Sequence, residues 1–337
     1  MSRTLRLALA AVLALLAAPR DAFAWGGVGH RLIGVAAARA LPPEIPAFLH
    51  RPQFAADLGE LAREPDRSKD AGKVHDHERN AGHFVDVEDD GRILGGPALL
   101  NLPPTRAEYE AALRAAGTDQ WQAGYLPYSI VDRTQQLAKD FAYWRVLTMG
   151  ERNPRWRAHR AWFAQDRRRR EALMFSSLGD LAHFVGDGSQ PLHVSAHYNG
   201  WGDYPNPKGY TTAKVHSPFE DAFVGDNLRQ PMVSARMAPL KVSAEPLEAR
   251  VAAYLNVTFH QVEPFYALEK AGGFQSRDPR GTAFAAERLA AGASELRDLI
   301  VLAWRMSGSL KVGWKPISVA DVEAGRVDPY NALYGVD

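Results

Sequence analysis

Histidines and carboxylates recur in the sequence at spacings that could bring them to one metal ion. In LGDLAHFVGDGSQPLH, His183 and Asp187 stand four residues apart on an expected helix, so their side chains leave the same face. Gly188 and Pro191 then end that helix and return His193 towards its last turn. Neutral imidazoles combined with hard carboxylates form a donor set suited to zinc.

Further donors lie in separate short segments. VHSPFED contains a second four-residue spacing, between His216 and Glu220. HFVDVED adds His83, REPDRSKD adds Asp66, and WGGVGH adds His30. A single pair of this kind is more often a surface ion pair than a metal site. The segment LAHFVGD is otherwise apolar, however, and a charge buried there needs a partner.

Not every acidic residue or histidine is assigned a role. Asp57 and Asp70 lie close enough to Asp66 in the sequence to compete with it as the ligand. The other histidines are expected to be structural or solvated, with two of them on a charged, solvated loop; they are His50, His75, His77, His159, His197 and His260.

Composition limits how the chain can hold phosphate and metal. It has 337 residues, a formal charge of +1 and no cysteine. This balance gives no general attraction to nucleic acid or to an anionic membrane, so affinity for phosphate must come from a local site. Without cysteine, stability must come from the hydrophobic core, and any metal must be held by histidine, carboxylate or backbone groups.

The first 24 residues have the pattern of a secretory signal peptide. A basic start precedes an apolar run at 7–18, and AFA at 22–24 fits the small-x-small cleavage rule. The apolar run is too short to span a bilayer, and no later stretch reaches the roughly 18 to 20 residues needed. We therefore expect a soluble mature chain, secreted or periplasmic, that begins at Trp25.

Helical periodicity dominates the rest of the chain. Apolar residues recur every three or four positions, and no stretch shows a sustained strand alternation. The expected helices cover residues 30–41, 105–117, 128–147, 170–187, 246–271 and 281–306. The sequence therefore predicts an all-α fold, with a single multi-helix domain over 25–315 and a C-terminal tail over 316–337.

Two long loops rich in Gly, Pro and Asn interrupt the helices, at 89–104 and 197–216. The second has little periodicity, and loops that long in compact domains are usually functional or disordered. Histidines bracket this loop, which favours a functional one. The four arginines at 167–170 are interpreted as the solvated start of a helix and not as a nucleic-acid patch.

Taken in chain order, these motifs resemble the zinc-dependent phospholipase C/P1 nuclease superfamily, whose members are all-α secreted phosphodiesterases with three zinc ions in one cleft. The resemblance runs from Trp25 to about Phe223. It comprises a mature N-terminal Trp with a nearby His, a PD followed by HFVD, then AHFVGDGSQPLH, then a His-x3-carboxylate. The Gly-Asp-x-x-Gln-Pro-Leu-His portion is highly specific.

The resemblance implies a ligand set for each of three zinc ions. The first set is Asp66, His83, His183 and Asp187; the second is Trp25, His30 and Asp187; the third is His193, His216 and Glu220. In this family the free α-amino group and the carbonyl of the first residue chelate a zinc, so the site would be assembled only after cleavage. An α-amino group has an unperturbed pKa of about 7.7 to 8.0 and loses its proton to a metal more readily than a lysine does.

The same resemblance implies the catalytic roles. Asp187 would bridge two metals, and Asp66 would also orient the attacking water. Lys69 stands where nuclease relatives tend to carry an Arg that grips phosphate, and a Lys supplies charge without a bidentate fork. Two metals can hold a hydroxide nucleophile, and a third can stabilise the leaving oxygen. Phe84, next to His83, could stack a base, although packing beside the metal explains it at least as well.

Two enzyme classes fit this site. WGGVGH and the 23-residue step from His193 to His216 resemble the S1/P1-type nucleases, which cleave single-stranded DNA or RNA to 5′-nucleotides, with 3′-nucleotidase activity as a further option. Glu220, where nucleases usually place Asp, together with HSPFEDAF and GYLPYSI, resembles a phospholipase C acting on phosphatidylcholine-type lipids. We favour the nuclease, because both spacings concern geometry whereas Glu for Asp is a tolerable ligand exchange.

A metal-stabilised binding protein without activity is the third alternative. It would need every zinc to be coordinatively closed. The predicted side chains and the chelating terminus are too few to close three sites, since Asp187 is shared, and this leaves positions for water and substrate. We therefore expect an enzyme that acts on nucleic acid strands, nucleotides or phospholipid, without an obligate protein partner.

Overall fold

The structure is a computed structural model and describes residues 25–243 and 245–335. The predicted signal peptide at 1–24 lies outside the described residues, so its removal stays a prediction. No helix in the described part of the chain is long and apolar enough to cross a membrane.

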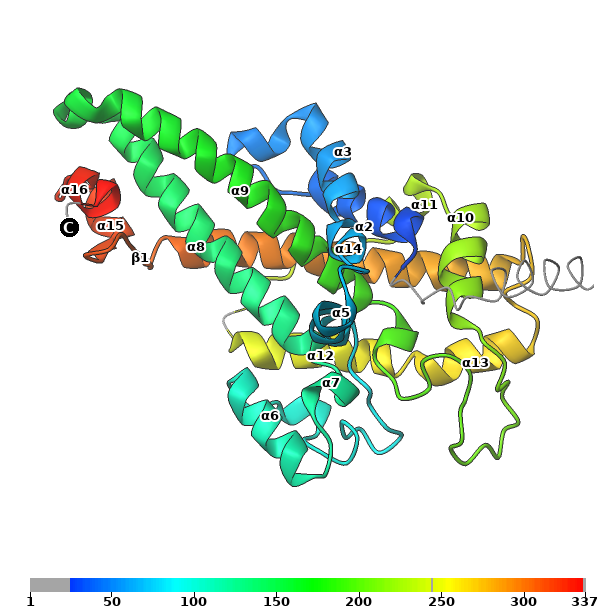
Figure 1. Ribbon diagram of the computed structural model, residues 1–337. Helices are drawn as coiled ribbons and strands as arrows, with labels where there is room; N and C mark the ends of the chain where they lie inside the picture. The colour runs from blue at the N-terminus through cyan, green and yellow to red at the C-terminus, as the bar shows by residue number, and fades with distance from the viewer. Residues whose placement is uncertain (1–24, 244, 336–337) are drawn as a thin grey trace, which may run out of the picture.

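Helices make up most of the described chain, which confirms the predicted all-α class (Figure 1). The longer helices are α2 (Gly27–Arg39), α3 (Pro52–Leu61), α8 (Leu126–Arg152), α9 (Arg160–Asp187), α12 (Leu247–Phe259), α13 (Val262–Lys270) and α14 (Pro279–Ser307). Within these described ranges, the one sheet is an antiparallel pair of short strands, β1 (Lys311–Val312) and β2 (Ile317–Ser318).

Shorter helices connect these elements. The α-helical ones are α4 (Glu64–Arg67), α5 (Lys73–Asn80), α6 (Arg106–Ala115), α7 (Gln120–Ala123), α10 (Val224–Asn227), α11 (Gln230–Ser234), α15 (Val319–Glu323) and α16 (Tyr330–Tyr334). The 3-10 helices are η1 (Ala47–His50), η2 (Ala81–His83), η3 (Leu99–Asn101), η4 (Pro154–His159) and η5 (Pro191–His193), and η6 (Pro218–Phe223) is a π-helix.

An antiparallel hairpin of α8 and α9 forms the frame of the molecule, and α14 and α2 pack against it (Figure 1). Fully buried side chains fix these contacts, such as Ile33 on α2, Phe141 on α8, Leu178 on α9 and Leu289 on α14. Each such side chain contributes about 1.5 to 3 kcal/mol when it is removed from water. The last turn of α9, with His183 and Asp187, is therefore held in the middle of the molecule.

Two helix boundaries differ from the sequence prediction. Helix α9 begins at Arg160, because a polar, arginine-rich stretch continues the helix where no apolar periodicity marks it. The arginines at 167–170 thus lie in its third turn and not at its start. The single helix predicted over 246–271 is wrong: α12 ends before α13 begins, because Pro264 has no N–H for the carbonyl of His260 and its ring clashes with that group.

The C-terminal residues pack on the outer end of the α8–α9 hairpin. Val312, Val319 and Val322 form a second buried cluster with Trp156 and Phe163 from that hairpin. The boundary predicted at residue 315 falls in the turn between β1 and β2. The segment beyond 315 therefore shares a small core with the helical frame.

Candidate metal centre

Three groups of buried histidines and carboxylates meet where α2, α4, α9, η2, η5 and η6 come together. In each group the donor atoms lie within 4.8 Å of one another; the groups are His30, Asp66 and His183; His83, His183 and Asp187; and His193, His216 and Glu220. The structure thus brings together all eight side chains that the sequence analysis selected as ligands.

The last turn of α9 holds the central pair. Nε2 of His183 lies 3.3 Å from Oδ2 of Asp187, and both side chains are fully buried. The ring of His183 donates its Nδ1–H to the carbonyl oxygen of Ala62, over 2.9 Å. This bond fixes the tautomer and leaves a lone pair on Nε2, the atom that faces the carboxylate.

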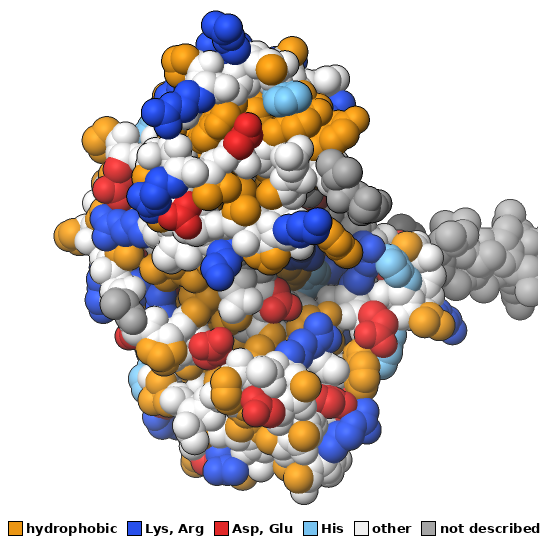
Figure 2. Space-filling view, turned by 90° about the vertical axis from the view of Figure 1, so that its left-hand side faces the viewer, with side chains coloured by type: hydrophobic (Ala, Val, Ile, Leu, Met, Phe, Trp, Pro, Cys, Tyr) orange, Lys and Arg blue, Asp and Glu red, His pale blue; other side chains and the backbone are white. Residues whose placement is uncertain are grey.

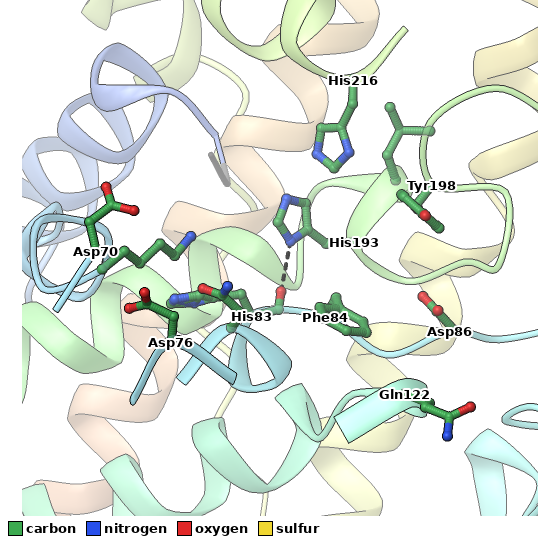
Figure 3. A pocket seen from close by; sticks show the side chains of 12 residues that line it. Asp70, Asp76, His83, Phe84, Asp86, Gln122, His193, Tyr198 and His216 are labelled. Carbon is green, nitrogen blue, oxygen red and sulfur yellow. Dashed lines mark hydrogen bonds between the residues drawn. The ribbon is translucent and has the colours of Figure 1, made fainter. Parts of the chain in front are cut away.

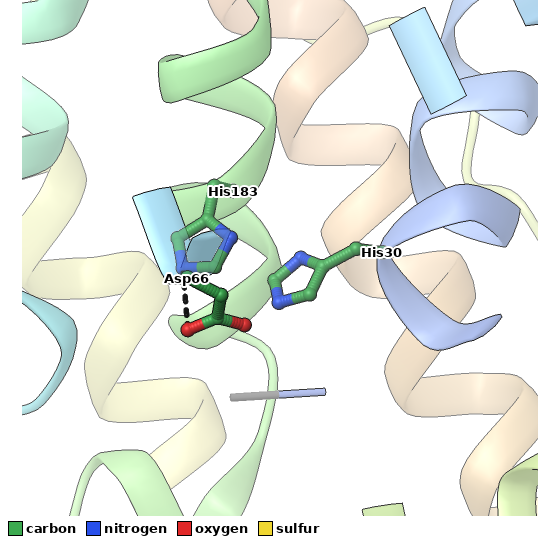
Figure 4. A group of neighbouring side chains, drawn as sticks. All are labelled: His30, Asp66 and His183. Carbon is green, nitrogen blue, oxygen red and sulfur yellow. Dashed lines mark ion pairs between the residues drawn. The ribbon is translucent and has the colours of Figure 1, made fainter. Parts of the chain in front are cut away.

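Helix α2 brings His30 to the other oxygen of the same carboxylate. Its Nε2 lies 3.4 Å from Oδ1 of Asp187, and its ring stacks on that of His183 with centroids 4.1 Å apart (Figure 4). Gly186 permits this approach, because a Cβ there would stand 2.9 Å from Nδ1 of His30. Asp66, on α4, completes the group with Oδ1 3.8 Å from Nε2 of His183.

Asp66 reaches this group, whereas its two competitors do not. Asp57 accepts a hydrogen bond from Gln53 at 2.9 Å, and Asp70 lines the neighbouring cavity. Lys69 lies one helical turn after Asp66, and its Nζ is 2.6 Å from Oδ1 of that carboxylate. Both side chains of this ion pair are largely buried, so the predicted phosphate-binding lysine stands at the edge of the donor groups.

His83 joins the first two groups to the third. Its Nδ1 lies 3.8 Å from Oδ2 of Asp187, and the edge of its ring meets that of His183. Its backbone carbonyl accepts a hydrogen bond from Nδ1 of His193, over 2.7 Å (Figure 3). As in His183, this bond leaves Nε2 of His193 as the free acceptor atom.

The third group lies on η5 and on the helical segment that contains η6. Nε2 of His216 is 2.9 Å from Oε2 of Glu220, and Nε2 of His193 is 3.8 Å from the same oxygen. Burial acts to raise the pKa of Glu220, but His216 and His193 together lower it to about 2. Glu220 lies within the π-helical turn, and such turns are frequent at functional sites.

Burial leaves several of these donor atoms without hydrogen-bond partners among the described residues. They include both ring nitrogens of His30 and both carboxylate oxygens of Asp187. Burial lowers the pKa of His183 to about 3, and burial together with repulsion from Asp66 raises the pKa of Asp187. Neutral imidazoles around a carboxylate that lacks a counter-charge are the arrangement that a divalent cation stabilises.

Trp25, the ninth predicted ligand, lies beside these groups. Its fully buried indole donates Nε1–H to Oγ of Ser189, over 2.8 Å, and packs 5.5 Å from the ring of Phe219. Ser189 follows Asp187 by two residues, and Phe219 directly precedes Glu220. The indole therefore fixes the backbone of Trp25 near the donor groups, and chelation by that backbone stays a prediction.

A cavity of about 400 Å³ opens beside His83, His193 and His216 (Figure 3). Lys69 and the half-buried Phe84 line it, as the sequence analysis requires of substrate contacts. Its other lining residues are Asp70, Asp76, Asn80, Asp86, Gln122, Leu192 and Tyr198.

Asp86, which is not among the candidate residues of the sequence, also lines this cavity. Val85 and Val87 are fully buried, while Phe84 and Asp86 alternate with them along the extended segment after His83. This two-residue alternation in HFVDV is the signal that could have found it. Burial raises the pKa of Asp86 well above its usual range.

Comparison with family models finds no match to the chain, and comparison with curated proteins finds none either. Its function therefore has to follow from the donor groups and the adjoining cavity. The groups are buried, offer only nitrogen and oxygen donors, and could hold metal ions.

Proposed function

We propose that the protein is a secreted zinc-dependent phosphodiester hydrolase of the phospholipase C/P1 nuclease superfamily, with three zinc ions in one cleft. The observation that carries this proposal is the linkage of the three donor groups. His183 belongs to two of them, and the hydrogen bond from His193 to the backbone of His83 connects the third. A cavity in the size range of small-molecule sites is lined by His83 of the second group and by His193 and His216 of the third.

The donor sets fit zinc in number and type. We assign Asp66, His83, His183 and Asp187 to one ion, Trp25, His30 and Asp187 to the second, and His193, His216 and Glu220 to the third. When bound, the ions would lower the pKa of a coordinated water and polarise the phosphoryl oxygens of the substrate. The tautomers of His183 and His193, fixed by their backbone hydrogen bonds, present Nε2 for this purpose.

The residues of the chain supply orientation and charge. Asp66 accepts a hydrogen bond from the attacking water and so holds its lone pair towards phosphorus. Lys69, which is paired with Asp66, also lines the cavity, so its ammonium group can bind a non-bridging oxygen of a phosphate that enters. The surrounding buried residues exclude bulk water, which strengthens both interactions.

The cavity favours a nucleic acid substrate. The ring of Phe84 offers a stacking surface for a base, and Asp86 on the same side offers a carboxyl group to the base edge (Figure 3). Unpaired bases can reach such a cavity, whereas stacked base pairs cannot. We therefore propose an S1/P1-type nuclease that cleaves single-stranded DNA or RNA to 5′-nucleotides.

A phospholipase C is the second candidate, and one feature of the cavity favours it. Asp70, Asp76 and Asp86 line a cavity that also contains the rings of Phe84 and Tyr198. Carboxylates and aromatic faces together bind quaternary ammonium groups, such as that of phosphocholine. Glu220, in place of the Asp usual in nucleases, also favours a phospholipase C.

The deciding experiment compares hydrolysis of single-stranded DNA and of phosphatidylcholine by the processed, zinc-loaded protein at equal concentration. Release of 5′-nucleotides with intact lipid is the expected result. Release of phosphocholine with intact DNA would contradict the nuclease proposal and support a phospholipase C. If a protein with three bound zinc ions acted on neither substrate, the hydrolase proposal itself would fail.

A further inference from the structure

The end of the molecule away from the donor groups carries a concentration of arginine. Residues 151–170, which run from the end of α8 through η4 into α9, contain eight arginines and only two carboxylates. This segment has a formal charge of +6, while the rest of 25–337 has a charge of −7, with histidine counted as neutral. Positive charge is thus gathered at one end of a chain that is otherwise acidic.

For half of these arginines, the described residues provide no ion-pair or hydrogen-bond partner to the guanidinium group. The exposed guanidinium groups without an ion-pair or hydrogen-bond partner in the described residues belong to Arg152, Arg155, Arg157 and Arg168. By contrast, Arg167 bonds to Glu151 at 2.7 Å, and Arg170 bonds to Asp140 at 2.9 Å. The run at 167–170 therefore divides between residues that hold the helices together and residues that face solvent.

Exposed aromatic rings lie on the same end of the molecule. Trp314, in the turn between β1 and β2, is 85% exposed, and its backbone N–H bonds to the carbonyl of Ala332 on α16. On α16, Tyr334 is 56% exposed, and the edge of its ring meets Trp162 of α9. Figure 2 faces this end and shows arginine and lysine side chains between hydrophobic ones.

We propose that this arginine-rich tip, defined as residues 151–170 with Trp314 and Tyr334, is a second binding surface for single-stranded nucleic acid. This proposal rests on the proposed nuclease function. It specifies that the substrate of the nuclease is a long strand, which the tip binds at a distance from the cleavage site. Guanidinium groups bind phosphate in a bidentate manner. Basic side chains mixed with aromatic rings are the usual surface for a single strand.

The position of the tip selects a polymer as its ligand. On α9, His183 lies 15 residues after Arg168 and 23 residues after Arg160, which at 1.5 Å per residue is about 22 to 35 Å. A dinucleotide or a lipid headgroup is too short to contact both places, whereas a strand can reach from one to the other. A bilayer held at the tip would also lie about 22 to 35 Å from the donor groups, so a membrane is the less suitable partner.

The test measures binding of a 30-nucleotide phosphorothioate oligothymidylate to the zinc-loaded protein by fluorescence anisotropy. The tip variant is R152Q/R155Q/R157Q/R168Q. The matched control, R39Q/R92Q/R236Q/K241Q, removes the same charge from exposed residues elsewhere. We expect the tip variant to bind at least about tenfold more weakly, and its slope of log K against log salt to fall by about 3, since each lost phosphate contact removes about 0.7. The control should stay within about twofold of the wild type, as expected away from phosphate contacts.

A second variant tests the aromatic part. Trp314→Ala should weaken strand binding about fivefold with an unchanged salt slope, because stacking involves no counterion release. Val257→Ala, at an exposed apolar residue on α12, is its control. The ratio of kcat/KM for a long strand to that for a dinucleotide should fall about tenfold in the tip variant.

Wild-type affinity and salt slope in the tip variant would overturn the proposal. So would a tip variant that loses binding to phosphatidylglycerol vesicles while strand binding is unchanged, since the surface would then be a membrane contact. Because binding is measured without cleavage, the two proposals fail separately. The wild type could bind the strand more tightly than the tip variant and yet release no nucleotides. That result would support the binding surface and contradict the proposed nuclease function.

Discussion

The imidazole rings of His30 and His183 lie face to face, with centroids 4.1 Å apart and planes inclined by 17°. Their Nε2 atoms approach different oxygens of Asp187, at 3.4 Å for His30 and 3.3 Å for His183. Two buried, stacked imidazoles cannot both carry a proton at neutral pH without strong repulsion. The pair therefore presents two neutral nitrogen donors on either side of one carboxylate, as expected of a residue that bridges two metal ions.

Replacing Asp187 with Asn should disturb two ions at once. The amide keeps the shape of the side chain but has one oxygen and no charge, so it cannot bridge the two zinc ions that lie beside His30 and His183 in the proposed site. We expect metal analysis to show a loss of about two of three zinc ions and hydrolysis to fall at least about a thousandfold, because nucleophile activation and charge stabilisation are lost together. Asp180→Asn, on the same helix but outside the three groups, is the matched control. Full zinc content in Asp187→Asn would show that the bridge is misplaced.

A free amine on Trp25 should be needed for one ion only. A protein that keeps Ala24 ahead of Trp25 has a peptide nitrogen there, which does not bind zinc at neutral pH as an amine does. We expect about one fewer zinc ion and the loss of most activity, with an unchanged fold. A protein with one residue added after Asp337 serves as the control. If both proteins bound three zinc ions, the amine of Trp25 would not be a zinc ligand.

Phe84→Ala tests the base-stacking role of the cavity. Loss of one base–aromatic stack costs about 1 to 3 kcal/mol, so KM for a dinucleotide should rise about fivefold or more while kcat changes little. Phe259→Ala, at a partly buried ring on α12 outside this cavity, controls for loss of packing. An unchanged KM with a lower melting temperature would identify Phe84 as a packing residue, the alternative left open by the sequence.

The sequence predicted the pairs that are local and left open the one that depends on tertiary packing. His183 and Asp187, like His216 and Glu220, meet because each pair lies one turn apart along a single helical segment. Asp66 lies on a four-residue helix, and its approach to His183 depends on how the chain after α3 packs on α9. No local spacing distinguishes it from Asp57 and Asp70.

The remaining gaps have physical causes of their own. The stacking of His30 on His183 follows from the crossing of α2 over Gly186, a contact between residues more than 150 positions apart. Pro264 indicates the break between α12 and α13 in the sequence, but the apolar periodicity that predicts a helix continues across this break. At the arginine-rich tip, composition alone cannot separate arginines that pair with α8 from those left exposed.

The buried histidines predict how the chelator-treated protein responds to acid. Burial lowers the pKa of His183 to about 3, and it lowers the pKa of His30, His83 and His193 as well. Below about pH 6.5 the unfolded chain takes up protons that the folded chain excludes, so the free energy of unfolding falls as the pH drops. Burial raises the pKa of Asp187, which acts in the opposite direction above its unfolded value. Burial raises the pKa of Asp86 in the same way, so buried carboxyl groups offset part of the effect of the four histidines, and the substitution of one histidine isolates its share.

Urea unfolding of the chelator-treated protein between pH 7 and pH 5 measures the share of one histidine when a variant is compared with the wild type. Each proton bound only by the unfolded chain contributes up to about 1.4 kcal/mol per pH unit. His183→Asn removes one such proton, so its unfolding free energy should depend less steeply on pH, by up to that amount. His50→Asn, at an exposed position on η1, should keep the wild-type slope. An equal pH dependence in His183→Asn and in the wild type would mean that the His183 ring takes up its proton in the folded state as well, and this neutral imidazole ligand would then be lost.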